Sequence, residues 1–317
     1  MREREVALLT SIQSIQSDRD RLFCWNRYDK SPSKMQNKLQ IELWNGRAGA
    51  SWVRHNTLLE TLLKGPGLCC LDQLDLESVS HALDIGCGCG NQTLTLAERL
   101  GKDAKVTGVD VSEPMLALAR DAVDHLGNDL CPIDFVCKDA SQPVFPAHHF
   151  DAVYSRFGVM FFDDPTEAFT HIRAAMKPAS PLAFICWQAP QKNPFFSAPM
   201  QAALTVLPAP PAPPAGAPGP FAFADNNRVN QILTDAGFNS IEITTLNEKL
   251  SVGAGAPFDE LFSELIEIGP ASALIAESDP SLKESAKAAV AEALRGFYDE
   301  KSGMSFEANF WLVTARA

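Results

Sequence analysis

Short apolar runs alternate with amphipathic segments between residues 81 and 187 of this chain. The apolar runs predict five strands, at residues 81–84, 105–110, 133–138, 150–155 and 182–187. The amphipathic segments predict helices at residues 92–100, 115–126 and 164–176, the second ending at Gly127. Strands that alternate with helices are typical of a parallel sheet covered on both faces, with functional loops at the carboxyl ends of the strands.

A segment without charged residues follows, at residues 193–224. Seven prolines fall within residues 208–220, so this stretch predicts an extended apolar loop rather than a membrane helix. Beyond it, the pattern predicts a helix from residue 226 to Gly237, a strand at 241–245, mostly helix over 257–299 and a last strand at 306–315. This pattern divides the chain into four parts, at residues 1–79, 80–190, 191–224 and 225–317.

Composition narrows the possible functions. The chain has 317 residues and a formal net charge of −12, which argues against a nucleic-acid binder because such proteins need a basic surface. The eight cysteines show no C-x-x-C spacing, so reduced thiols in a cytoplasmic protein are expected, with no metal site. The charged start of the chain predicts no signal peptide, and no window predicts a transmembrane helix.

The strongest local signal is a glycine-rich turn at Asp84–Gly90, between a predicted strand and a predicted helix. Its spacing is G-x-G-x-G after an acidic residue, whereas dinucleotide binding favours G-x-G-x-x-G. Asp110 ends the next strand, where a carboxylate accepts hydrogen bonds from a ribose diol. Asp139 follows the third strand, where a carboxylate meets an adenine amino group. Asp110 and Asp139 are therefore placed to bind a ribose and an adenine.

Four motifs occur in order, reading DIGCGCG at 84–90, GVDVSEPM at 108–115, KDA at 138–140 and FDAVYSRF at 150–157. Together they resemble the successive motifs of class I S-adenosylmethionine-dependent methyltransferases. A later segment, MKPASPL at 176–182, is similar to the turn before their fifth strand, although Ala179 and Ser180 replace its two glycines. The resemblance covers residues 80–190. It implies an α/β Rossmann-like fold whose mostly parallel seven-stranded sheet has an antiparallel last strand, with an N-terminal helical lid and a helical insertion near the C-terminus.

The same resemblance implies that S-adenosyl-L-methionine is the cofactor and S-adenosyl-L-homocysteine the product. The glycine loop corresponds to the part that holds the methionine portion, Asp110 to the ribose binder, and Asp139 to the adenine reader. Met115 either flanks the adenine or packs in the core. The implied cofactor-binding set is Asp84, Gly86, Cys87, Gly88, Asp110, Val111, Met115, Asp139, Ala140 and Ser155.

An aromatic segment, WNGRAGASW at 44–52, precedes the fold. It is similar to the N-terminal segment of bacterial small-molecule methyltransferases related to quinone and menaquinone C-methyltransferases. Runs at 155–165 and 311–316 also resemble that group. An amphipathic aromatic segment can close over a cofactor cleft and exclude water. Trp44 and Trp52 are therefore expected in a lid that contacts the acceptor, the alternative being ordinary packing aromatics.

The end of the fourth strand reads Ser155-Arg156-Phe157-Gly158 and lacks the run that binds a planar amino group, which argues against nucleobase or glutamine nitrogens as acceptors. Arg156 is interpreted either as a ligand for a substrate or cofactor carboxylate or phosphate, or as a salt-bridge partner of a residue such as Asp163. His55, in the lid segment, is the candidate catalytic base, with a packing role as the alternative. Phe157 and Trp187 are candidate acceptor contacts.

Transfer of a methyl group from a sulfonium needs positioning and desolvation more than acid chemistry. We therefore expect methyl transfer to an oxygen or carbon of a small organic acceptor, with the proline-rich loop over the acceptor side, unless that loop is only a linker. A quinone or lipid-like acceptor at a membrane surface is one alternative. A catalytically silent subunit that binds the cofactor is the other. A homodimer is the expected oligomer.

Overall fold

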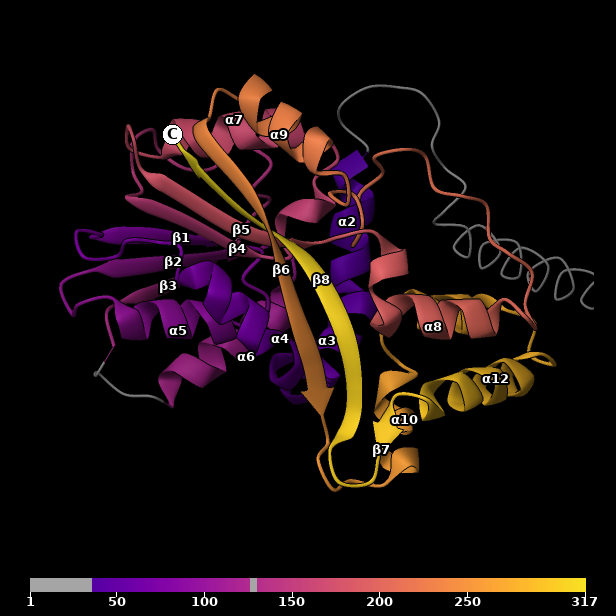
Figure 1. Cartoon of the computed structure of the whole chain (residues 1–317). Coiled ribbons are helices and arrows are strands. Elements are labelled where there is room, and N and C mark those ends of the chain that lie inside the picture. The colour runs from indigo at the N-terminus through magenta and orange to yellow at the C-terminus, as the bar shows by residue number, and fades with distance from the viewer. Residues whose placement is uncertain (1–35, 126–129) are drawn as a thin grey trace, which may run out of the picture.

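A mixed sheet forms the centre of the computed structural model, which describes residues 36–125 and 130–317 (Figure 1). The strand order is β3-β2-β1-β4-β5-β8-β6, and only β8 among these runs antiparallel to its neighbours. The strands are β1 (His81–Ile85), β2 (Lys105–Asp110), β3 (Ile133–Cys137), β4 (Ala152–Arg156), β5 (Pro181–Trp187), β6 (Asn239–Val252) and β8 (Gly303–Arg316). The predicted fold class is confirmed.

The sheet departs from the sequence prediction in the number and length of its strands. A two-residue strand, β7 (Tyr298–Asp299), pairs with the start of β8 and makes an eighth strand where seven were predicted. A strand of two residues is too short to show a periodic pattern of apolar positions, so the sequence did not indicate β7. β6 and β8 each have 14 residues. β6 is longer than predicted because polar positions such as Asn247 and Lys249 belong to this edge strand, where they are exposed to solvent. Phe150 forms only an isolated bridge with Met176, ahead of β4.

Helices cover both faces of the sheet, as the alternating pattern predicted. α4 (Asn56–Leu71), α5 (Asn91–Arg99) and α6 (Glu113–Asp124) lie on one face, whereas α7 (Pro165–Ala175) and α9 (Asn226–Asp235) lie on the other (Figure 1). Two more helices from the N-terminal part, α2 (Gln36–Asn45) and α3 (Arg47–Arg54), contact each other beside the sheet edge. The predicted end of the second helix at Gly127, and Cys24, lie outside the described residues.

The uncharged segment at residues 193–224 is not one continuous loop. Its first part forms α8 (Pro194–Ala203), and the proline-dense part from 208 to 214 has no regular secondary structure. A proline at the first helical position is compatible with a helix, and α8 packs against α11 (Gly269–Glu277) and α12 (Lys283–Arg295) of the C-terminal insertion. α10 (Phe258–Leu265) completes that insertion. The four-part division at 1–79, 80–190, 191–224 and 225–317 remains a proposal about folding units.

The turn before β5 keeps a left-handed residue although its glycines are replaced. Ala179 has φ 64°, its N–H donates to the Ala317 carbonyl at 3.2 Å, and its carbonyl accepts from Arg316 at 3.2 Å. A left-handed alanine costs about 1 kcal/mol relative to the right-handed conformation. Contacts with the C-terminal residues therefore hold the turn in place.

Among the described residues, no helix combines the length and the apolar character that a membrane span needs.

His81, the first residue of β1, predicts a pH effect on stability. Burial and the neighbouring His149 lower its pKa from 6.5 to about 4. The unfolded chain therefore takes up a proton at a higher pH than the folded chain, and His81 destabilises the fold as the pH falls from about 6.5 to about 4. We expect the melting temperature of a His81→Gln variant to rise relative to the unmodified protein as the pH drops from 7 to 5.

The matched control is His125→Gln, at the exposed end of α6. Its melting temperature should follow the unmodified protein across the same pH range. Calorimetry at pH 7, 6 and 5 measures all three proteins. A constant difference between His81→Gln and the unmodified protein would contradict the assignment.

Candidate functional site

A cavity of about 1150 Å³ lies at the carboxyl ends of β1, β2 and β4. The glycine loop after β1 forms one part of its wall, and side chains of α2 and α3 form another. Residues 213–222 of the proline-rich loop and the start of α11 close the remaining sides. Sites for one drug-sized ligand usually measure about 300–1,000 Å³, so this cavity has room for a cofactor and a second molecule.

The floor of the cavity depends on two glycines that touch across neighbouring strands. Gly86 follows β1 with φ 67°, and an added Cβ there would lie 2.6 Å from the Gly158 Cα. An added Cβ on Gly158, which follows β4, would lie 2.5 Å from the Ile85 carbonyl oxygen. Side chains at these positions would collide with backbone. The glycines therefore bring the two strand ends into direct contact beneath the cavity.

Asp84 is fully buried at the end of β1 and lines the cavity. Its Oδ2 accepts a hydrogen bond from the Thr93 hydroxyl at 2.6 Å. Burial raises the pKa of Asp84 to about 6, against the Thr93 hydrogen bond and the charge of Arg156, which both lower it. A positively charged ligand group beside this carboxylate would favour its ionised form.

Asp110 ends β2 and braces the glycine loop. Its Oδ2 accepts from the Gly88 N–H at 2.8 Å, and its Oδ1 accepts from the Ser112 N–H at 2.8 Å. Burial raises the pKa of Asp110, although these N–H donors oppose that shift. Each oxygen retains a further acceptor site for a ligand hydroxyl. The geometry therefore fits the predicted ribose binder.

The predicted adenine reader, Asp139, is also in the wall of the cavity, with Ala140 beside it. It accepts from the Ser141 N–H at 3.0 Å and from the Asn37 side chain. Asn37 comes from α2, so a residue of the N-terminal segment donates a hydrogen bond directly to Asp139. Val111 and Met115 line the cavity between Asp110 and Asp139, and a Cβ on Gly88 would lie 2.8 Å from the Met115 Cε.

The N-terminal segment is held over this edge by hydrogen bonds to the loop after β2. Asn45 donates to the Val111 carbonyl at 2.7 Å and accepts from the Glu113 N–H at 3.1 Å. The Ser112 hydroxyl donates to the Trp44 carbonyl at 2.7 Å. The N-terminal segment therefore lies next to the residues expected to read the nucleoside, and its action as a lid stays a prediction.

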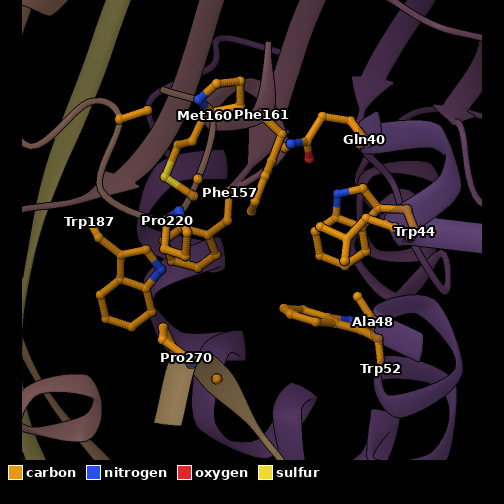
Figure 2. Close-up of a pocket in the computed structure, with 18 of the residues that line it drawn as sticks. Gln40, Trp44, Ala48, Trp52, Phe157, Met160, Phe161, Trp187, Pro220 and Pro270 are labelled. Atoms are coloured by element: carbon orange, nitrogen blue, oxygen red, sulfur yellow. The ribbon is translucent and has the colours of Figure 1, made fainter. Parts of the chain in front are cut away.

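Aromatic side chains line the rest of the cavity from two sides (Figure 2). Trp44 makes edge contacts with Trp52 and Phe161, with ring centroids 5.9 and 5.0 Å apart. Facing them across the cavity are Phe157 and Trp187, whose rings stack at 5.0 Å. We call this part the aromatic compartment; its walls are Trp44, Trp52, Phe157, Met160, Phe161, Trp187, Phe196, Pro220, Phe221 and Pro270.

Phe157 has a strained backbone. Its φ is 61°, a region that a bulky residue rarely adopts, and its N–H donates to the Ile185 carbonyl at 3.1 Å. Strain of this kind persists only where surrounding contacts enforce it and is concentrated at functional sites. Here it places the ring against Trp187 in the wall of the cavity.

Two predicted site residues are not brought to the cavity wall. The Ser155 hydroxyl is buried and donates to the Ile85 carbonyl at 2.8 Å, so it links β4 to β1 instead of facing a ligand. His55 is 6% exposed, and its ring nitrogens lie 3.1 Å from Glu267 and 3.6 Å from Glu264. These bonds join the start of α4 to the insertion between α10 and α11. The packing alternative stated for His55 describes its position, whereas no such alternative was considered for Ser155.

Arg156 does line the cavity, but its partner differs from the one considered in the sequence. It forms an ion pair with Glu60 of α4 at 2.8 Å, not with Asp163.

The cysteines of the glycine loop, Cys87 and Cys89, are buried free thiols. Burial raises the pKa of both thiols, that of Cys89 to about 12. They fill space beside the ligand positions as neutral groups.

Several residues of the cavity were missed by sequence reasoning. Phe161 belongs to a run that the family resemblance pointed to, so its position was accessible from the sequence. Asn37, Glu60, Phe196 and Pro270 carry no local pattern, because they reach the cavity from segments distant in the chain. Glu277 also lines the cavity, and burial raises its pKa against the charge of Arg47.

Comparison with known proteins identifies the domain that carries the nucleoside-reading edge. Residues 82–179 match the family model described as a methyltransferase domain. Phosphoethanolamine N-methyltransferase 3 of Arabidopsis thaliana is 31% identical over 108 residues, 34% of this chain and 21% of that protein. Demethylmenaquinone methyltransferase of Listeria monocytogenes is 31% identical over 110 residues, 35% of this chain and 46% of that protein. The chain thus spans less than half the length of these curated relatives.

The fold has solved counterparts. A Haemonchus contortus phosphoethanolamine N-methyltransferase 2, solved with phosphomonomethylethanolamine and S-adenosylhomocysteine, superposes with a TM-score of 0.52 at 17% identity, over 90% of this chain and 61% of that one. This similarity concerns the fold alone. The family model thus identifies residues 82–179 as a methyltransferase domain, and the fold is the one that class I S-adenosylmethionine-dependent methyltransferases share.

Proposed function

We propose that this protein transfers a methyl group from S-adenosylmethionine to an oxygen or carbon of a small, largely apolar organic acceptor. The observation that carries the proposal is that one cavity is lined both by the carboxylates of the glycine loop and the strand ends and by the aromatic compartment. A methyl donor and an acceptor must occupy adjacent parts of one water-excluded site for a direct transfer. The cavity supplies both parts.

The residues present fit the cofactor. Asp110 and Asp139 offer acceptors for ribose hydroxyls and an adenine amino group, and the close contact between Gly86 and Gly158 forms the floor beneath the space that the cofactor would occupy. S-adenosylmethionine, when bound, supplies an activated methyl group on a sulfonium. Asp84, fully buried beside this space, has a carboxylate suited to a neighbouring positive charge.

The acceptor class is inferred from the walls of the aromatic compartment. Flat aromatic walls favour a planar apolar body through stacking and edge contacts. Gln40 adds one polar feature, because its Oε1 is buried beside the compartment with no hydrogen-bond partner among the described residues (Figure 2). A hydroxyl on the acceptor would satisfy that oxygen. A hydroxylated aromatic compound therefore fits better than a small polar amine.

The same walls would also accept the ring of a quinone, which is the second candidate acceptor. Demethylmenaquinone methyltransferases among the relatives are consistent with it, although the similarity covers only the nucleoside-reading part. A small-molecule partner rather than nucleic acid, a homodimer and a cytoplasmic location stay predictions of the sequence.

The test measures release of S-adenosylhomocysteine with a panel of acceptors. The panel contains hydroxylated aromatic compounds, detergent-solubilised prenyl quinones and phosphoethanolamine. We expect turnover with the first class. Turnover with prenyl quinones alone would support the second candidate, and turnover with phosphoethanolamine alone would contradict the apolar acceptor. Tight cofactor binding without turnover on this panel or on a metabolite extract would favour a silent binding subunit.

Trp52→Ala tests the acceptor side separately from the cofactor side. Loss of a buried aromatic contact at a binding centre typically costs 2 kcal/mol or more, so kcat/KM for the acceptor should fall by about 30-fold. The Kd for S-adenosylhomocysteine should stay within about twofold, because Trp52 has its ring contact with Trp44, whereas Asp110 and Asp139 are hydrogen-bonded to other residues. Steady-state kinetics and isothermal titration measure the two quantities.

The control for Trp52→Ala is Phe145→Ala, which removes a partly buried ring that contacts Phe150 outside the cavity wall. Its stability should fall while acceptor kcat/KM is retained. Equal losses of kcat/KM in the two variants would mean that Trp52 acts only through stability.

A further inference from the structure

A buried ion pair lies beside the glycine loop and is only partly satisfied. The Arg156 Nη2 is 2.8 Å from the Glu60 Oε2, and the two side chains are 13% and 18% exposed. The Nη1 of the same guanidinium is buried and has no hydrogen-bond partner among the described residues. Buried polar groups almost always have partners, and an unpaired charged donor is costly. The unpaired nitrogen therefore indicates a ligand that the protein alone does not supply.

The guanidinium is held in one position by its neighbours. Arg156 lies against α4 at Gly67, where an added Cβ would be only 2.8 Å from the Arg156 Cδ. Gln92 lies over the same glycine, with its Oε1 2.7 Å from that Cβ position. Gln92 donates to the Glu60 Oε1 at 3.2 Å and accepts from the Tyr154 hydroxyl at 3.1 Å. These contacts hold the side chains of both Glu60 and Arg156 in place.

Gln92 also shows that the Arg156–Glu60 pair lies beside the start of α5, a second feature that favours an anion. It belongs to the first turn of α5, whose N-cap Gly90 makes no side-chain capping bond and whose first turn contains no acidic residue. The first N–H groups of a helix lack partners within the helix and carry partial positive charge. Arg156, Asn91 and Gln92 all line the cavity, immediately after the glycine loop. A negatively charged ligand group is thus favoured between Arg156 and the start of α5.

We propose that Arg156 binds the carboxylate of the methionine portion of S-adenosylmethionine, with Glu60 as the positioning residue that holds its guanidinium. This inference rests on the proposed function. An arginine can bind a carboxylate through two parallel hydrogen bonds, and only Nη2 is engaged by Glu60. The assignment combines the two interpretations made from the sequence, since Arg156 forms a salt bridge, with Glu60 and not Asp163, and keeps a free nitrogen for the cofactor carboxylate.

The experiment compares two ligands that differ in one group. S-adenosylmethionine and decarboxylated S-adenosylmethionine are titrated into the full chain by calorimetry. A charge-assisted hydrogen bond in a buried site should make the unmodified protein bind S-adenosylmethionine about 10- to 100-fold more tightly. In Arg156→Gln that preference should shrink to a few-fold, through weaker binding of S-adenosylmethionine and little change for the decarboxylated ligand.

Removal of Arg156 alone leaves Glu60 buried without its partner, which destabilises a protein strongly. The double variant E60Q/R156Q removes both charges and should show the same loss of preference with a better retained fold. Arg99→Gln is the matched control, since Arg99 pairs with Asp72 at 2.5 Å outside the cavity wall. It should keep the full preference.

The outcomes separate this inference from the proposed function. If the unmodified protein binds neither ligand, the proposed function is wrong. If it binds both with equal affinity, the cofactor assignment stands and the role of Arg156 is overturned. Equal weakening of both ligands in E60Q/R156Q would also overturn it, because the pair would then act only on the fold. The comparison of ligands on the unmodified protein holds even if Arg156→Gln does not fold.

Discussion

Gly158→Ala should weaken cofactor binding by at least about 100-fold and lower the free energy of unfolding by about 1–3 kcal/mol. The added methyl group would lie 2.5 Å from the Ile85 carbonyl oxygen and 2.8 Å from the Gly86 Cα. Both are backbone atoms, so no side-chain rotation relieves the collision. The strand ends that form the cavity floor must separate instead.

The backbone conformation of Gly158 makes this substitution informative. Its φ of −81° and ψ of −43° suit alanine as well as glycine. Any loss therefore comes from the close approach of the two strand ends and not from backbone strain. Displacement of a binding floor by about 1 Å is enough to cost about 100-fold in a positioned complex.

Gly65→Ala is the matched control for this prediction. Gly65 lies exposed inside α4, and an added Cβ meets nothing within 4 Å. Alanine there should stabilise the protein by up to about 1 kcal/mol and leave the Kd unchanged. Thermal unfolding and titration with S-adenosylhomocysteine measure both variants. Unimpaired binding by Gly158→Ala would show that the strand contact does not shape the cofactor site.

Asp110→Ala should raise the Kd for S-adenosylhomocysteine by about 100-fold. Hydrogen bonds to a charged group contribute about 1.5–3 kcal/mol each, and the carboxylate is expected to accept from the ribose. The substitution also removes the acceptor for the Gly88 and Ser112 N–H groups, so the glycine loop loses its brace. Both the lost ribose hydrogen bonds and the loosened glycine loop should weaken binding of the cofactor.

A second ligand distinguishes direct contact from bracing. If Asp110 binds the ribose, the unmodified protein should prefer 5′-methylthioadenosine over its 2′-deoxy counterpart, and Asp110→Ala should lose that preference. Asp134→Ala is the control, since Asp134 is an exposed residue of β3 that pairs with Lys105. Unchanged binding by Asp110→Ala would refute the ribose assignment.

The cofactor side of the site was predictable because each of its parts is local. Asp84 and Asp110 lie at the ends of β1 and β2 and Asp139 follows β3, and parallel strands end at the same edge of a sheet. The spacing of Gly86 and Gly88 belongs to a single turn. Short-range patterns therefore placed these residues together without knowledge of any distant contact.

Residues whose partners are distant in the chain could not be assigned in the same way. Arg156 and Glu60 are 96 positions apart by number and meet only because α4 packs beside β4. His55 was a candidate base in the sequence, yet the packing of α4 against the α10–α11 connection pairs it with Glu267. A side chain shows its chemistry in the sequence, whereas its partner depends on how the helices pack.

The sequence by itself determined the fold class and the end of the sheet where turn glycines and carboxylates gather, because strand periodicity and turn motifs are encoded over a few neighbouring residues. The type of cofactor followed from the resemblance of four ordered motifs to a known family. Only the tertiary structure decided how the aromatic compartment is closed, since α2, α3, the proline-rich loop and α11 meet there from opposite ends of the chain. It also decided that Arg156 has one nitrogen paired and one free. Burial and pairing are properties of the packed molecule, so no local pattern carries them.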